Sequence, residues 1–99
     1  MSVDIYIKDS SFNVSNTNFR WIMGRLGIPI DGYLCGELCP QHLYDKVQAV
    51  DAKIFERETM TEGNICYQGV SPEQAILYHS KLIILARNAI NSGKIIVHG

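Results

Sequence analysis

The last third of the chain, residues 71–97, constrains the fold most, because it encodes a helix with both ends marked and a strand directly after it. Ser71 and Gln74 have the spacing of a capping box, with a proline between them at the first helical position. Gly93 is placed to end this helix. Residues 94–98 are short and rich in β-branched side chains, which predicts a strand.

The first third predicts a strand and a helix. Residues 3–8 alternate apolar and polar side chains, the pattern of a half-buried strand, and residues 9–11 have the composition of a turn. A helix is expected to begin after the cap Ser15 and to end at Gly27. Its apolar stripe at helical spacing is Phe19, Ile22, Met23 and Leu26.

The middle of the chain predicts one more helix between two loops. Residues 30–36 carry two turn signals and are expected to form a loop. Cys39 precedes Pro40, so the second helix is expected to start there. Its core stripe is Leu43, Val47, Val50 and Ile54. Residues 57–63 are polar and are expected to form an exposed, mobile loop.

The expected fold is α+β with the order β-α-α-α-β. The strands near the two ends are expected to pair, because an isolated strand has nowhere to place its backbone hydrogen bonds. Three helices would then pack on a two-stranded sheet. At 99 residues, the chain 1–99 has the size of a single compact domain.

The third helix carries residues that its core does not explain. At about 100° per residue, one half of the circumference is filled by apolar side chains. These are Ala75, Ile76, Tyr78, Leu82, Ile83, Leu85, Ala86, Ala89 and Ile90. Leu77 and Ile84 fall on the polar side instead, either as scattered surface residues, or under the 57–70 loop, or as a contact face for a partner or a second copy. His79 falls among the apolar residues, either bonded to a carbonyl or hydroxyl in the core or serving as a ligand or proton-transfer group.

Trp21 is a similar exception in the first helix. It lies opposite the core stripe, beside Arg20, Gly24 and Arg25. A tryptophan flanked by two arginines has the composition of an interface hot spot, and a glycine inside a helix permits another backbone to approach closely. The alternatives are that the N-terminal strand or the 28–38 loop covers Trp21, or that its ring stacks on a nucleotide base.

One cluster of cysteine and histidine resembles a metal site. Cys35, Cys39 and His42 have the spacing C-x3-C-x2-H, which offers three zinc ligands. Candidates for a fourth ligand are Cys66, His79 and His98. The commoner C-x2-C clamp is missing, so no bound metal or other cofactor is expected. The start of a helix favours a thiolate, which makes Cys39 a candidate nucleophile.

The composition excludes several classes of function. A net charge of −1 gives no reason to expect nucleic-acid binding, and no apolar run is long enough to span a membrane. Three cysteines without an export signal favour a reducing compartment, the cytoplasm. No catalytic motif is visible.

The leading hypothesis is therefore a non-catalytic protein-interaction module. It would act as an inhibitor or adaptor of a larger protein, of the kind that viruses and mobile elements encode, and could form a homodimer. Its contact residues would be Arg20, Trp21, Gly24, Arg25, Leu77 and Ile84. The alternatives are a small metal- or ligand-binding domain using the Cys35, Cys39 and His42 cluster, and a small enzyme with Cys39 as nucleophile.

Overall fold

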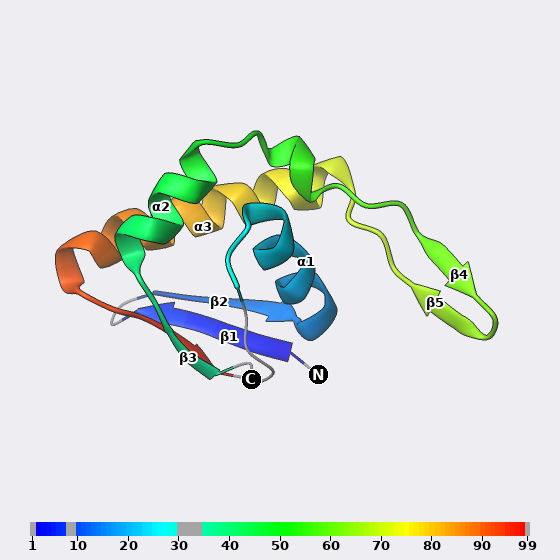
Figure 1. Ribbon diagram of the computed structural model, residues 1–99, viewed down its shortest axis with the longest axis horizontal. Coiled ribbons are helices and arrows are strands. Elements are labelled where there is room, and N and C mark those ends of the chain that lie inside the picture. Colours follow the sequence, from blue (N-terminus) through cyan, green and yellow to red (C-terminus); the bar gives the residue numbers. More distant parts are fainter. Residues whose placement is uncertain (1, 8–9, 30–34, 99) are drawn as a thin grey trace.

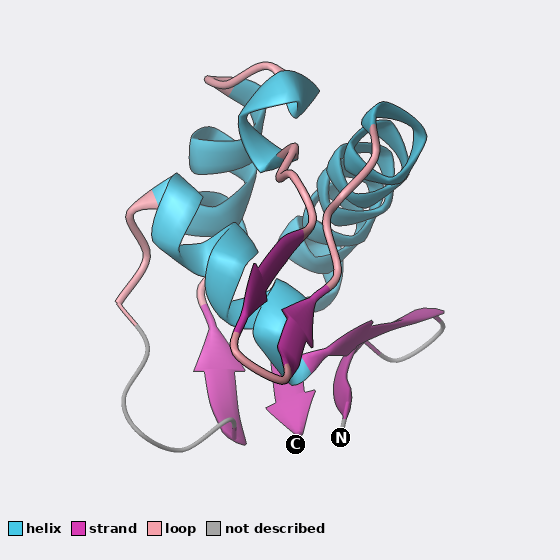
Figure 2. Ribbon diagram, turned by 90° about the vertical axis from the view of Figure 1, so that its right-hand side faces the viewer, coloured by secondary structure: helices cyan, strands magenta, loops and turns pink. Residues whose placement is uncertain are grey.

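Helices cover one face of a four-stranded antiparallel sheet, and a separate β-hairpin projects from this body (Figures 1 and 2). The computed structural model describes residues 2–7, 10–29 and 35–98. In chain order the elements are β1 (Ser2–Ile7), β2 (Ser10–Ser15), α1 (Asn16–Leu26), β3 (Cys35–Leu38), α2 (Pro40–Gln48), the 3-10 helix η1 (Ala52–Phe55), β4 (Met60–Glu62), β5 (Ile65–Tyr67), α3 (Pro72–Ser92) and β6 (Ile95–His98).

The sheet has the strand order β2-β1-β6-β3, and every neighbouring pair is antiparallel. The predicted pairing of the two terminal strands is confirmed, with Ile5 opposite Val97. The prediction of a two-stranded sheet is wrong, because β2 and β3 extend it on both sides. Part of the predicted 9–11 turn belongs to β2, and part of the predicted 30–36 loop belongs to β3. The rest of those two predictions lies outside the described residues.

The predicted ends of the first and third helices are confirmed. The Ser15 hydroxyl accepts a hydrogen bond from the Asn18 backbone at 3.2 Å, and Gly27 ends α1 with a left-handed φ of 71°. Both bonds of the capping box are present at the start of α3, each 3.2 Å long between Ser71 and Gln74. These contacts satisfy backbone groups that would otherwise lack partners at a helix end.

The second helix is shorter than predicted. It begins after Cys39 as expected but ends at Gln48, and η1 follows it. The Asp51 carboxylate caps η1 by accepting from the Lys53 backbone at 2.9 Å, which favours a new start rather than a continuous helix. Val50 and Ile54 lie beyond α2 and pack partly buried against the core.

The core lies between the sheet and the three helices. It comprises Val3, Ile5, Ile7, Phe12, Val14, Phe19, Ile22, Met23, Leu26, Ile28, Leu43, Val47, Phe55, Val70, Ala75, Leu82, Leu85, Ala86, Ala89, Ile95 and Val97. Ile76 and Ile90 were predicted to join it but are 59% and 41% exposed. The buried strip of α3 is therefore narrower than half of the helix circumference, and three of its positions are alanines.

Residues 57–70 form an arm and not the predicted loop (Figure 1). At its base, the backbones of Arg57 and Val70 exchange two hydrogen bonds of 3.1 and 2.7 Å. Further out, β4 pairs with β5 around a turn in which Gly63 has a φ of 61°. Gly69 lies against the opposite arm segment, where an added Cβ would stand 2.3 Å from the Arg57 carbonyl oxygen.

Candidate protein-interaction surface

Trp21 connects α1 to η1 and is partly buried. Its indole N–H donates a 2.8 Å hydrogen bond to the Phe55 carbonyl oxygen. The prediction that the core stripe of α1 faces the core is confirmed, since its four residues are buried and Trp21 is not among the buried residues. The ring is covered in part by η1, a contact that the spacing of residues in the sequence does not reveal.

Two guanidinium groups lie over the Trp21 ring. Arg25 and Arg57 approach its centroid at 5.6 and 5.3 Å, within the range of cation–π attraction. Arg25 also donates through Nε to the Ile54 carbonyl at 3.0 Å. The indole is therefore held in one orientation by η1 and by two cations.

Arg57 joins the arm to α1. Its terminal nitrogen donates to the Asn18 side-chain oxygen at 2.7 Å and to the Gln68 carbonyl at 2.5 Å. Its Nε is buried and finds no hydrogen-bond partner among the residues that the structure describes. Charge-assisted bonds of this kind are among the stronger ones, so Arg57 fixes the angle at which the arm leaves the body.

A hollow opens between α1 and the arm. It has a volume of about 330 Å³. Its lining residues are Thr17, Arg20, Trp21, Arg57 and Met60, and the hollow is named the Trp21 groove below. A smaller hollow of about 160 Å³ adjoins it through Thr17 and Arg57 and reaches Cys66. The groove thus offers an aromatic ring and a methionine between two arginines.

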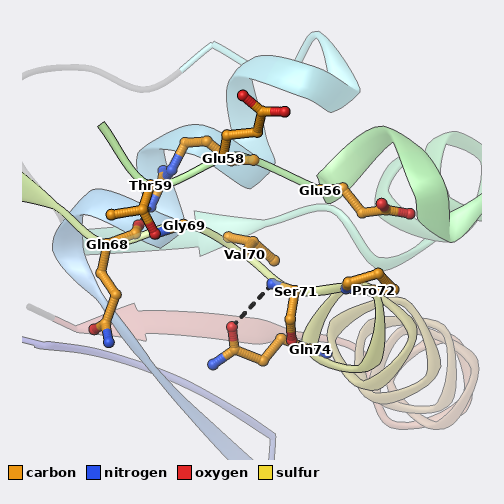
Figure 3. A pocket seen from close by; sticks show the side chains of 10 residues that line it. Glu56, Glu58, Thr59, Gln68, Gly69, Val70, Ser71, Pro72 and Gln74 are labelled. Carbon is orange, nitrogen blue, oxygen red and sulfur yellow. Dashed lines mark hydrogen bonds between the residues drawn. The ribbon is translucent and has the colours of Figure 1, made fainter. Parts of the chain in front are cut away.

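A wider depression of about 620 Å³ lies where the base of the arm meets α3 (Figure 3). Its lining residues are Glu56, Arg57, Glu58, Thr59, Gln68, Gly69, Val70, Ser71, Pro72 and Gln74. Gln74 is already used in the capping box, as the dashed line in Figure 3 shows. The two glutamates contribute negative charge, but the described residues place no histidine or cysteine in the depression.

The outer part of the arm is exposed on all sides. Met60 and Ile65 are 56% and 57% exposed, and all residues from 60 to 66 are exposed. The register places Met60, Glu62 and Ile65 on one face of the hairpin and Thr61 and Cys66 on the other. Val70 is the one residue of the arm that belongs to the core within the described chain. The other apolar side chains of the arm are therefore not needed for core packing.

The outward side of α3 carries a second exposed apolar surface. Leu77 and Ile84 are 49% and 52% exposed, which confirms that the core does not use them and shows that residues 57–70 do not cover them. Ile76 and Ile90 are exposed beside them. We name this surface the outer α3 face. Of the predicted contact residues, Arg20, Trp21 and Arg25 come together on α1, whereas Leu77 and Ile84 lie apart on α3.

Gly24 is exposed on α1 with open space around it. A Cβ added there would meet no atom within 4 Å. Within the described part of the chain, no backbone therefore makes the close approach that a glycine inside a helix permits.

His79 is half-buried, and its ring bonds to carbonyl groups, which agrees with the carbonyl contact of the first alternative. Its Nε2 lies 3.0 Å from both the Val47 and the Val50 carbonyl oxygens. Because both partners are acceptors, the proton must be on Nε2 and must be shared between them. His79 thus satisfies carbonyls at the end of α2 and ties that helix to α3.

The cysteine and histidine candidates are dispersed. Cys39 precedes α2 and His42 lies in its first turn, and both are exposed. Cys66 is on the arm, and the backbone register pairs Cys35 with His98. The described residues contain no group of three His, Cys, Asp or Glu placed to hold a metal ion.

Comparisons of the chain with protein-family models, with curated proteins and with solved structures found no match. Among the described residues, none of the helices combines the length and the apolarity needed to cross a bilayer.

Proposed function

We propose that this protein is a non-catalytic interaction module that contacts a larger protein through its arm and the Trp21 groove, as an inhibitor or adaptor. The observation that carries the proposal is the arm itself. It projects from the body, exposes Met60 and Ile65 by more than half, and adds only its innermost residue to the core (Figure 1). Exposed apolar side chains on a protruding element are typical of a binding surface.

The groove indicates the chemistry of the partner. Trp21 and Met60 offer apolar contact area, and Arg20 and Arg57 stand beside them. Tryptophan and arginine are enriched at the energetic centres of interfaces. A segment that places an apolar side chain next to acidic residues would complement this surface. Charge complementarity would also speed association and make it depend on salt concentration.

The location we propose is the cytoplasm. Cys39 and Cys66 are exposed and form no disulfide within the described part of the chain, which agrees with thiols in a reducing compartment.

Crosslinking with matched charge reversals tests the proposal. A photoreactive side chain at position 65 should capture one protein in extract of the native cell. Arg20→Glu should abolish the capture, because it reverses a charge in the groove. Lys46→Glu makes the same change at an exposed position of α2, a helix that lies away from the arm (Figure 1), and should leave the capture intact. Equal capture by both variants, or no captured protein at all, would refute the proposal.

A further inference from the structure

The outer α3 face repeats with a period of seven residues. Glu73, Ser80 and Arg87 occupy one position of the repeat. The apolar side chains occupy the two positions at its side, Ile76, Ile83 and Ile90 at one and Leu77 and Ile84 at the other. A heptad pattern on an exposed helix face is typical of a seam that packs against another helix. Ile83 is half-buried by its own chain, and the other four are exposed.

The charges on this face discriminate between pairing directions. Two parallel copies of α3 would bring Glu73 next to the same residue of the partner, and likewise Arg87, so both contacts would be repulsive. Two antiparallel copies that cross at Ser80 would place Glu73 of each helix opposite Arg87 of the other, because both lie seven residues from Ser80. Like charges would therefore disfavour the parallel arrangement, and opposite charges would favour the antiparallel one.

The same crossing pairs the apolar residues. A two-fold axis at Ser80 brings Ile76 opposite Ile84 and Leu77 opposite Ile83. Ser80 would meet its own copy on the axis, where a small side chain lets the two backbones approach. A two-fold interface must be self-complementary, and this face meets that condition in both its charges and its apolar contacts.

From this self-complementarity we infer that the outer α3 face binds a second copy of this chain, with the two α3 helices antiparallel and crossing at Ser80. The inference goes beyond the proposed function and uses a different surface, so that either can fail alone. A helix of 21 residues is about 30 Å long. A contact along one helix is smaller than a standard interface of about 1,600 Å², so we expect a weak dimer that dissociates on dilution.

Charge-swap variants test the pairing by sedimentation. Glu73 and Arg87 are exposed and form no ion pair within the described residues. They are 14 residues apart on one helix, about 21 Å, so they cannot compensate one another within a chain. Arg87→Glu and Glu73→Arg should each raise the dimer Kd by about tenfold or more at low salt. The double variant restores both opposite-charge contacts across the axis and should bring the Kd back to within about threefold of wild type.

Ile84→Glu should give a folded monomer, since it places a charge in the apolar seam. Circular dichroism of each variant separates loss of pairing from loss of fold. Wild-type protein that remains monomeric up to about 1 mM would overturn the inference, because a Kd above that concentration corresponds to less than about 4 kcal/mol of binding free energy, too little for the specific pairing inferred here. A dimer whose double variant is no tighter than the single variants would overturn it as well. The crosslinking experiment at position 65 depends on neither result.

Discussion

At the scale of single residues, the half-buried His79 shows how a polar side chain can tie two elements together. Its Nε2 serves two carbonyls at the end of α2, both at 3.0 Å. His79→Phe keeps the ring volume but leaves Val47 and Val50 without this donor. We expect it to lower the free energy of unfolding by about 1–2 kcal/mol. Urea denaturation measures the change, with the exposed His42→Gln as a control that should stay within about 0.5 kcal/mol of wild type.

Trp21 contributes to stability through its hydrogen bond and through the contacts of its ring. Two substitutions separate these contributions. Trp21→Phe removes only the hydrogen bond to the Phe55 carbonyl and part of the ring. It should lower the free energy of unfolding by about 1 kcal/mol. Trp21→Ala also removes the apolar contacts and the stacking with Arg25 and Arg57, and should cost about 2–3 kcal/mol, less than a fully buried tryptophan. Equal stability of wild type and Trp21→Ala would show that these contacts contribute nothing in solution.

At the scale of elements, replacing each of two glycines by alanine is expected to have opposite effects, one stabilising and one disruptive. Gly24 lies in an exposed helix with open space around it, so Gly24→Ala should raise the free energy of unfolding by up to about 1 kcal/mol. Gly69→Ala would place a methyl group against the backbone at Arg57 and Thr59, so it should open the base of the arm. Thermal melts compare the stabilities, and amide hydrogen exchange at Val70 reports the arm. A melting temperature lowered by Gly24→Ala would contradict the first prediction.

The helices whose limits the sequence predicts correctly are those with capping residues or a terminating glycine at their ends. Ser15, Gly27 and Ser71 determine local backbone geometry by themselves, so the limits of α1 and α3 were predictable. The exposed side of α3 was predictable only in part. Leu77 and Ile84 follow from helical spacing, but the exposure of Ile76 depends on how closely α3 packs on its neighbours.

The strands that were missed depend on partners far along the chain. Residues 11–15 alternate polar and apolar side chains. The two serines at the start of residues 10–15 favour a turn, however, and only the pairing with β1 makes this segment a strand. Residues 35–38 include a glycine with a φ of 146° and have little intrinsic strand preference, so their pairing with β6 places them in the sheet. The arm had one local signal, Gly63-Asn64, which is a two-residue hairpin turn, but its polar flanks concealed the strands. The Trp21 groove could not be foreseen, because it depends on the arm.

At the scale of the whole molecule, the protein consists of a body and an arm with separate tasks. The structure extends 45 Å along its longest axis but only 27 and 22 Å along the others, and the arm accounts for the elongated outline (Figure 1). The buried residues belong to the body and to the base of the arm. The sheet and helices therefore have no need of residues 60–67.

Replacing residues 60–67 with a Gly-Asn turn tests this division. The substitution keeps the Arg57 and Val70 backbone pair and the bond from the Gly69 N–H to the Thr59 hydroxyl, so the base of the arm should still close. We expect the melting temperature to change by less than about 4 °C, which corresponds to under about 1 kcal/mol for a domain of this size. The dimer Kd should be unchanged, because α3 is untouched, whereas capture of the partner by a photoreactive group at position 17 in the groove should be lost. A shortened protein that melts without cooperativity would show that the arm supports the fold, and one that still captures the partner would place the contact surface on the body alone.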